Sequence, residues 1–382
     1  MSDIIILDNK DQNIKIAGKK KNSDFFNKLN NVFLAFQKIK IKDKVVFYRL
    51  VSVMLDSGMT LIRAITTLER QEKNKYIKDM YQNFLINLKE GKNLSECLEN
   101  YSMSFSESEI GMVKSGEKTG KLNESLLSIA DQVEKISSII TKLKGALIYP
   151  AIIIIVVLGV IIVMMIFVVP KLLEIFENKD ALPVTTKLLI NISDFLISYG
   201  WTLFIGLIVV YIFSSVWIQT EEGKFYFDKF KLNIPKFGDI YKKYILSKFA
   251  RIFSNLIASG VSVVESLRIV ANSLNNEIYR QRILLLMEDV KSGIKIWESI
   301  DSDPLFPDMM VQMIQVGEQT ATLDKTIIKV ADFYDEQFSV TIATINKLIE
   351  PLIIVFLAVT VGFIAISIMQ PIMGLADQIS NS

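Results

Sequence analysis

Residue types that commonly do chemistry are scarce in this chain of 382 residues. It has no histidine and one cysteine, Cys97, so Ser-His and Cys-His nucleophiles, the usual zinc sites and histidine-based pH sensing are excluded. No Gly-x-x-x-x-Gly-Lys-Ser/Thr or Gly-x-Gly-x-x-Gly loop is present to cradle a nucleotide. We therefore expect no catalytic residue, no metal and no other cofactor, and we interpret Cys97 as a small core residue without a redox partner.

The polar motif that stands out is a glycine-glutamate sequence that occurs twice. Its residues are Gly116, Glu117, Gly120 and Leu122 in the first copy and Gly317, Glu318 and Leu323 in the second. The pattern predicts a turn between two helices, in which Gly116 ends the first helix and Thr119 caps the next. An alternative interpretation places the two glutamates on exposed connections where a partner docks. Ala321 replaces the second glycine, which predicts that the second copy needs less backbone freedom there.

The motif belongs to an internal duplication. Many residues recur at a separation of 202 positions and then, after a one-residue slip, of 201. The matched pairs include Arg49/Arg251, Gly58/Gly260, Gly91/Gly293, Phe105/Phe306, Pro150/Pro351 and Pro170/Pro371. Thr60 and Ser262 are placed to cap the helix after the first glycine of each copy. Strand-like alternation is absent, so each copy is expected to fold as about six short helices.

Three segments are long and apolar enough to cross a membrane: Ala151–Val169, Ile197–Trp217 and Leu352–Met369 carry no charge. With 51% hydrophobic and 22% charged residues, the chain is predicted to be an all-α membrane protein with two homologous cytosolic six-helix modules in tandem and three transmembrane helices. The expected parts are an N-terminal extension (1–42), module 1 (43–145), span 1 (146–170), an external loop (171–196), span 2 (197–217), module 2 with its linker (218–348), span 3 (349–370) and an external tail (371–382).

The duplication also predicts the topology. Two modules in the same compartment require the unmatched middle span to bring the chain back across the membrane. Lysine and arginine are few in residues 170–196 and absent after Met369, which favours modules inside, a cytoplasmic N-terminus and an external C-terminus.

Each module meets its span at a proline, in Tyr149-Pro150 and Glu350-Pro351. Proline removes a backbone donor, so the sequence predicts a kink or a restart of the helix there. The kink would either let the span leave the module at an angle or act as a hinge that transmits rotation. Glu350 would either stay in headgroup water near Lys347 or be a buried carboxylate that contacts another helix.

The N-terminal extension is basic, because residues 1–44 contain ten lysines and five aspartates. Its apolar residues from Phe25 to Ile39 fall on one face of a predicted helix. Such a helix either packs on the following module or lies on an anionic leaflet or a partner. The formal charge of the whole chain is only +2, so we expect no direct binding of nucleic acid.

Two helical modules, each with the glycine-glutamate turn and a proline-started span, resemble the type II secretion F family over about residues 43–375. The resemblance implies an assembly platform without catalytic activity, located in the bacterial cytoplasmic (inner) membrane in a type IV pilus, type II secretion or competence machine. It implies as partners a hexameric secretion or pilus-assembly ATPase, pilin or pseudopilin subunits, inner-membrane alignment proteins, membrane lipids and further copies of the chain, as a dimer or larger oligomer. The glycine-glutamate residues match the family signature, and Tyr149, Pro150, Glu350 and Pro351 match its module-to-span junctions.

The mechanism expected from this resemblance is that the motor turns or shifts the modules and that helices continuous across the junctions carry the motion into the membrane. Gly145, Gly159 and Gly362 are candidates for close contact with a pilin helix. The competing class is a membrane transporter, since internal repeats are common there. Three spans without a central ionisable residue count against it. A receptor would need a folded outer domain, for which residues 170–196 are too few.

Overall fold

The computed structural model describes residues 39–168, 183–235 and 237–380, and within these ranges the chain contains helices and no strand. The chain is an all-α membrane protein. It divides into two compact units, Met1–Glu134 with Ser259–Val261 and Lys135–Ala258 with Ser262–Ser382. The amphipathic helix expected around residues 25–38 and the first part of the expected external loop, up to residue 182, lie outside the described residues.

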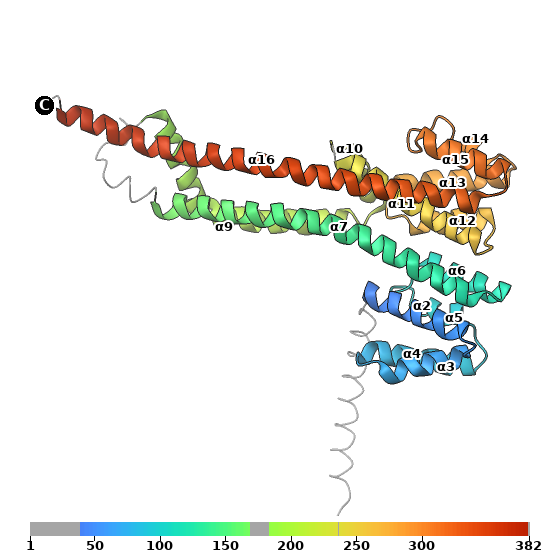
Figure 1. The fold of residues 1–382 in the computed structure, drawn as a ribbon. Coiled ribbons are helices and arrows are strands. Elements are labelled where there is room, and N and C mark those ends of the chain that lie inside the picture. The colour runs from blue at the N-terminus through green and yellow to red at the C-terminus, as the bar shows by residue number, and fades with distance from the viewer. Residues whose placement is uncertain (1–38, 169–182, 236, 381–382) are drawn as a thin grey trace, which may run out of the picture. The chain divides into compact units, whose positions relative to one another are not determined.

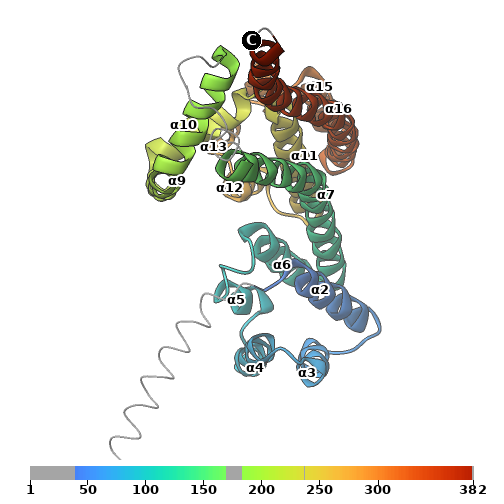
Figure 2. The ribbon, with the colours of Figure 1, turned by 90° about the vertical axis from the view of Figure 1, so that its left-hand side faces the viewer.

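The first module is formed by six helices, as the sequence predicts. They are α2 (Ile41–Asp56), α3 (Leu61–Gln71), α4 (Lys75–Lys89), α5 (Leu94–Glu99), α6 (Glu107–Thr119) and the beginning of α7 (Leu122–Val163). Figure 2 shows α3 and α4 side by side within this unit. The aromatic rings of Phe47, Phe84 and Phe105 are buried between the helices, with ring centroids 6.2–6.4 Å apart. These rings supply much of the apolar burial that holds the short helices together.

The second module repeats this arrangement with α11 (Phe237–Ala258), α12 (Val263–Ser273), α13 (Glu277–Lys291), α14 (Ile296–Ile300), α15 (Asp308–Gln319) and α16 (Leu323–Ser380). Phe249 and Phe306 pack with their centroids 5.8 Å apart, as their counterparts Phe47 and Phe105 do in the first module. Helix α11 lies along the first part of α16 (Figure 1). The predicted pair of six-helix modules is confirmed.

The predicted caps and turn glycines are also found in both modules. Thr60 and Ser262 accept a hydrogen bond from the backbone N–H three residues on, each at 3.4 Å, and so cap α3 and α12. Gly58 and Gly260 have φ of 80° and 86°. A left-handed residue at the end of a helix favours glycine, which explains why this position is glycine in both copies.

The candidate membrane spans lie on three long helices, as expected: within Leu122–Phe167, within Ser198–Trp217 and within Leu323–Ser367. Helix α7 is followed directly by a π-helical turn, Met164–Val168. Helix α9 covers Val184–Trp217, so residues 184–196, assigned to an external loop, are helical. Helix α16 continues to Ser380, so most of the expected tail is helical as well. Apolar composition alone did not reveal these ends, because polar residues such as Thr185, Thr186 and Ser193 continue the helix.

Polar residues join the three long helices near these extended ends. The Thr186 hydroxyl donates to the Ser367 carbonyl at 2.7 Å, and the Ser193 hydroxyl donates to the Met165 carbonyl, in the π-helical turn, at 2.6 Å. Hydroxyl groups within apolar surroundings need such carbonyl partners. The turn Ile218–Thr220 and helix α10 (Glu221–Asn233) then lead to the second module.

Ala321 contradicts its prediction. The residue adopts φ of 53°, the left-handed conformation that Gly120 adopts with φ of 72°, so the second turn needs the same backbone freedom. Ala321→Gly is therefore expected to stabilise the second module by about 0.5–1 kcal/mol, because the relief of left-handed strain exceeds the added chain entropy. Thermal unfolding of the full chain in detergent measures this, with Gly120→Ala as the matched control of opposite sign. A lower unfolding temperature for Ala321→Gly would contradict the interpretation.

Candidate functional site

The first glycine of each motif lies inside a helix, not at its end. Helix α6 continues to Thr119, and a Cβ atom on buried Gly116 would lie 2.5 Å from the Ser125 Oγ atom and 2.8 Å from its Cβ atom, on α7. A Cβ atom on Gly317 would likewise collide with the Thr326 hydroxyl. The prediction that Gly116 ends the helix is wrong. Glycine is required here because two consecutive helices cross closely.

The turn itself is made by the end of the motif. Gly120 is the left-handed residue after α6, and α7 begins at Leu122. The Thr119 hydroxyl donates to the Ser115 carbonyl of its own helix at 2.9 Å, so it does not cap α7 as predicted. A threonine that bonds back to the carbonyl four residues earlier is common within helices.

The glutamate after this glycine holds a short helix in place. The Glu117 carboxylate accepts hydrogen bonds from the Leu94 N–H at 2.6 Å, the Ser95 N–H at 3.2 Å and the Ser95 hydroxyl at 2.6 Å. These groups form the first turn of α5, whose N-cap residue Asn93 makes no side-chain capping bond. Glu117 therefore supplies the cap from another helix, which satisfies donors that would otherwise be unpaired.

The second glutamate has the same place. The Glu318 carboxylate accepts from the Ile296 N–H at 3.0 Å and the Trp297 N–H at 3.1 Å, in the first turn of α14. Glu318 also lines a cavity of about 380 Å³, together with Gly317, Ala321 and Leu323 of the motif and the charged residues Lys295 and Asp324. The motif of the second module is thus accessible from outside at this cavity.

Cys97 is fully buried, which confirms its interpretation as a core residue. Burial, with the nearby Glu117 carboxylate as a second cause, raises the pKa of its thiol to about 11. A thiol with such a pKa is protonated and unreactive at neutral pH.

In both modules an arginine of the first helix pairs with two acidic residues of the last helix, an arrangement we call the arginine clamp. Arg49 Nη2 lies 2.9 Å from Asp131 Oδ1 and 2.5 Å from Glu134 Oε2, between α2 and α7. The Arg49/Arg251 match was visible in the sequence, but its acidic partners were missed. The signal that identifies them is an acidic pair on the last helix of each copy, which recurs at the same separation of 201 positions.

The clamp in the second module is more buried. Arg251 Nη2 contacts Asp332 Oδ1 at 2.8 Å and pairs with Asp335, and its side chain is 6% exposed. A serine one turn after each arginine adds a second tie: the Ser52 hydroxyl donates to the Asn123 carbonyl at 2.8 Å, and the Ser254 hydroxyl to the Asp324 carbonyl at 2.6 Å. The first helix of each module is therefore fixed to the helix that enters the membrane.

The prolines do not restart those helices. Helix α7 contains Pro150 within its 42 residues, and α16 runs from Leu323 to Ser380 through Pro351, both visible as unbroken ribbons in Figure 1. Pro150 is buried and Tyr149 is 58% exposed. Of the two predicted alternatives, a kink or a restart, the restart is wrong because one missing donor does not end a helix that the surrounding apolar sequence continues. The kink stays a prediction. The Glu350 side chain lies outside the described residues, so its two alternatives stay open.

The role of the motif glutamate yields a direct test. Glu117→Ala removes the acceptor for two buried amides, and we expect it to lower the free energy of unfolding of the first module by about 1–3 kcal/mol. Hydrogen exchange at the Leu94 and Ser95 amides should become faster, while the exposed neighbour substitution Lys118→Ala leaves it unchanged. Unaltered protection of α5 in the Glu117→Ala protein would contradict the capping role.

Two repeated helical modules, each built around a glutamate-capped helix and continued into a span, define a duplicated helical membrane protein. The family model for the type II secretion system protein F matches residues 47–170 and 249–371, one match to each repeat. The chain therefore belongs to the type II secretion system protein F family.

Relatives at similar identity come from two kinds of machine. The chain is 29% identical to the type IV pilus assembly protein TapC of Aeromonas hydrophila over 342 residues, 89% of this chain and 83% of that protein. It is 30% identical to the type IV pilus assembly protein PilC of Thermus thermophilus, over 89% of this chain and 84% of that protein. It is 30% identical to a type II secretion system protein F of Aeromonas hydrophila, over 92% of this chain and 91% of that protein.

Proposed function

We propose that this protein is an inner-membrane platform of a type IV pilus assembly machine, which couples a cytosolic hexameric ATPase to the insertion and extraction of pilin subunits. Family membership and the names of the pilus relatives support this proposal. The observation that carries the mechanism is that the last helix of each module runs unbroken into a span. A rigid helix transmits a displacement of the module to the membrane, whereas a flexible joint would absorb it.

In this mechanism the chain itself performs no catalysis and ATP is hydrolysed in the partner. The arginine clamps at Arg49 and Arg251 make each module move with its exit helix, because they fix the first helix to the last. The cavity beside Glu318 is a candidate docking point for the motor. It has charged groups of both signs in Lys295, Glu318 and Asp324, which suit a polar and reversible contact.

The pilin subunit would be handled between the spans. An apolar groove of about 300 Å³ lies between the first and third spans, with Val156, Val160, Leu357 and Val361 among its lining residues. A Cβ atom added at Gly145, Gly159 or Gly362 would meet no neighbouring side chain or other helix within 4 Å. Small residues let a foreign helix approach closely in lipid. We propose that this groove shields the apolar helix of a pilin or pseudopilin while it enters the filament.

The remaining features of the proposal follow the topology expected from the sequence. The modules and the N-terminus face the cytoplasm, the C-terminus is external, and the protein works as a dimer or larger oligomer with inner-membrane alignment proteins and lipids. A type II protein secretion or competence DNA-uptake platform is the second candidate. The secretion relative, which is 30% identical over 92% of this chain, favours it as much as the pilus relatives favour the first.

The motor coupling can be tested by co-purification. The full chain is extracted from host membranes in mild detergent together with the assembly ATPase of the same machine, and retention of the ATPase is measured with and without nucleotide. We expect the ATPase to be retained, and Lys295→Glu at the cavity rim to reduce retention without a change in thermal unfolding. No retention by the wild-type chain would contradict the proposal. Full retention of the ATPase by the Lys295→Glu variant would show that the ATPase does not dock at this cavity.

A further inference from the structure

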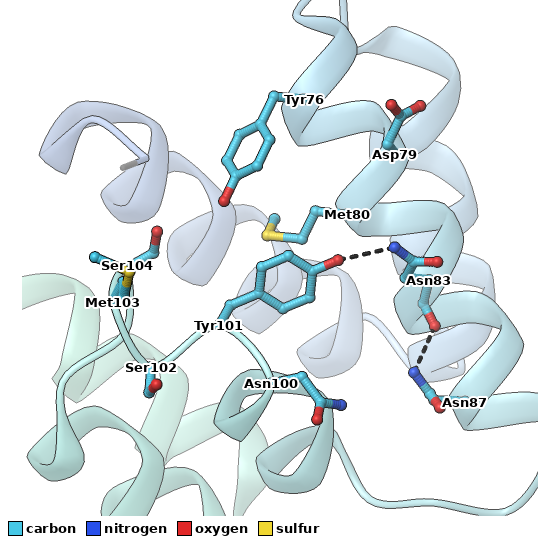
Figure 3. A pocket seen from close by; sticks show the side chains of 10 residues that line it. All are labelled: Tyr76, Asp79, Met80, Asn83, Asn87, Asn100, Tyr101, Ser102, Met103 and Ser104. Atoms are coloured by element: carbon cyan, nitrogen blue, oxygen red, sulfur yellow. Dashed lines mark hydrogen bonds between the residues drawn. The ribbon is translucent and has the colours of Figure 1, made fainter. Parts of the chain in front are cut away.

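The first module contains an open groove of about 690 Å³ that the proposed function does not use. Helix α4 forms one wall with Tyr76, Asp79 and Asn83, and the segment after α5 forms the other with Tyr101 and Met103 (Figure 3). The Asn83 side-chain amide donates to the Tyr101 hydroxyl at 2.9 Å across the groove. Met103 is 56% exposed, so the groove offers a ligand an exposed methionine and two tyrosines beside polar asparagine and serine side chains.

The second module has an ion pair at the corresponding place. The position of Met80 is taken there by Arg282, which pairs with Asp303 and donates to the Ser299 carbonyl. The first module has Ser102 where the second has Asp303, so no such ion pair can form. The described parts of the two modules therefore differ at this place in their charged side chains.

The chain enters the first module at the rim of this groove. Ile39 is buried, and its N–H donates to the hydroxyl of Ser104, a groove-lining residue, at 3.3 Å. The chain that precedes Ile39 is therefore attached next to the groove. The last part of this preceding chain, residues 22–38, contains Lys28, Lys38 and one aspartate, Asp24, and the charged residue in the groove lining is Asp79.

In the second module, the segment that precedes the first helix of the module is helical and packs on the module. Helix α10 precedes α11 as residues 1–38 precede α2, and it packs on α13, the counterpart of α4. The Asp228 carboxylate of α10 accepts from the Glu277 N–H at the beginning of α13 at 2.9 Å, and Lys224 lies 3.3 Å from Glu277. By the duplication, α4 is the helix of the first module that corresponds to the helix on which α10 packs.

We propose that the groove is the docking site of this chain's own N-terminal segment, residues 22–38, which lays its phenylalanine-rich face on Tyr76, Tyr101 and Met103 and directs a lysine to Asp79. Phenylalanine rings and methionine sulfur atoms pack favourably, and the tether at Ile39 gives the segment a high effective concentration at the groove. The extension is thus a part of the first module and not a free membrane-binding arm.

Cross-linking of the full chain tests this docking. In a Cys97→Ser background, which copies Ser299 of the second module, Asn83→Cys is combined with one cysteine in the segment and treated with a short bismaleimide. We expect an efficient cross-link within one chain for cysteines on the apolar face and little for those on the polar face. The apolar-face positions are Phe26, Leu29 and Phe33, and the polar-face positions are Asn27 and Asn31.

The matched control replaces Asn83→Cys by Leu285→Cys, because Leu285 is the exposed counterpart of Asn83 in the second module. Deletion of residues 2–38 should also raise the maleimide labelling rate of Asn83→Cys severalfold. Equal cross-linking at Asn83 and Leu285, or a labelling rate unchanged by the deletion, would overturn the proposal. Cross-links only between two chains would assign the groove to a second copy. Loss of the cross-link on adding anionic vesicles would assign the segment to the membrane.

Discussion

Glu109→Met alone is expected to lower the free energy of unfolding of the first module by about 3–5 kcal/mol. The Glu109 carboxylate lies 2.7 Å from the Lys44 ammonium and 2.8 Å from the Tyr48 hydroxyl, and both charged side chains are under 10% exposed. Removal of the carboxylate leaves Lys44 buried without its counter-charge. The same carboxylate and burial keep the pKa of the Tyr48 hydroxyl well above its ordinary value, burial being the larger cause, so the pair and the phenol form one buried network.

The second module provides the control for this prediction. At the positions of Lys44 and Glu109 it has the apolar residues Leu246 and Met310. Both of these side chains are buried. The triple variant Lys44→Leu/Tyr48→Phe/Glu109→Met is therefore expected to recover most of the stability that Glu109→Met loses, because replacement of a buried ion pair by apolar groups is often close to neutral. Thermal unfolding of the full chain in detergent compares the two. A triple variant as unstable as the single one would show that the network is needed for the packing itself.

A flexible Gly-Ser insertion at Pro150 is expected to abolish filament assembly while membrane insertion and the fold of both modules persist. Helix α7 is continuous from Leu122 to Val163, and the clamp between Arg49 and the acidic pair at Asp131 and Glu134 fixes it to α2. The insertion interrupts the helix between this clamp and the apolar span. Surface filaments counted by electron microscopy in a complemented deletion strain measure the effect.

Two controls distinguish the loss of rigid coupling from a general effect of inserting residues. The same insertion in the connection at Lys73, between α3 and α4, should leave filament number unchanged. A helical insertion of seven residues at Pro150 adds about 10 Å but nearly restores the rotational register, since a helix has about 3.6 residues per turn. It should therefore retain more assembly than the flexible one. Normal filament numbers with the flexible insertion would contradict rigid coupling.

The sequence predicted those features that are fixed by repeated local patterns. The six helices of each module, the caps at Thr60 and Ser262 and the apolar spans follow from periodicity, cap residues and composition. The placement of α10 before the second module and the beginning of α9 at Val184 did not follow, because polar residues in these segments form helices through tertiary contacts that no local pattern reports.

The sequence identified the residues of the candidate site, but it did not predict their structural roles correctly. Gly116 was assigned to a helix end because glycine commonly ends helices, but its place is decided by the close crossing of α6 and α7. Glu117 gave no sign of its partner, since the amides of Leu94 and Ser95 are backbone groups more than twenty residues away. Ala321 shows the limit of propensity: the fold imposes a left-handed turn on a residue that disfavours it.

The most direct test of the platform function is an in-frame deletion of the gene with complementation, in which surface filaments, secreted proteins and DNA uptake are measured together. We predict that the deletion removes filaments and that the wild-type gene restores them. Persistence of filaments with specific exoproteins trapped would assign the chain to a secretion system. No change in any of the three measurements would contradict the platform function itself.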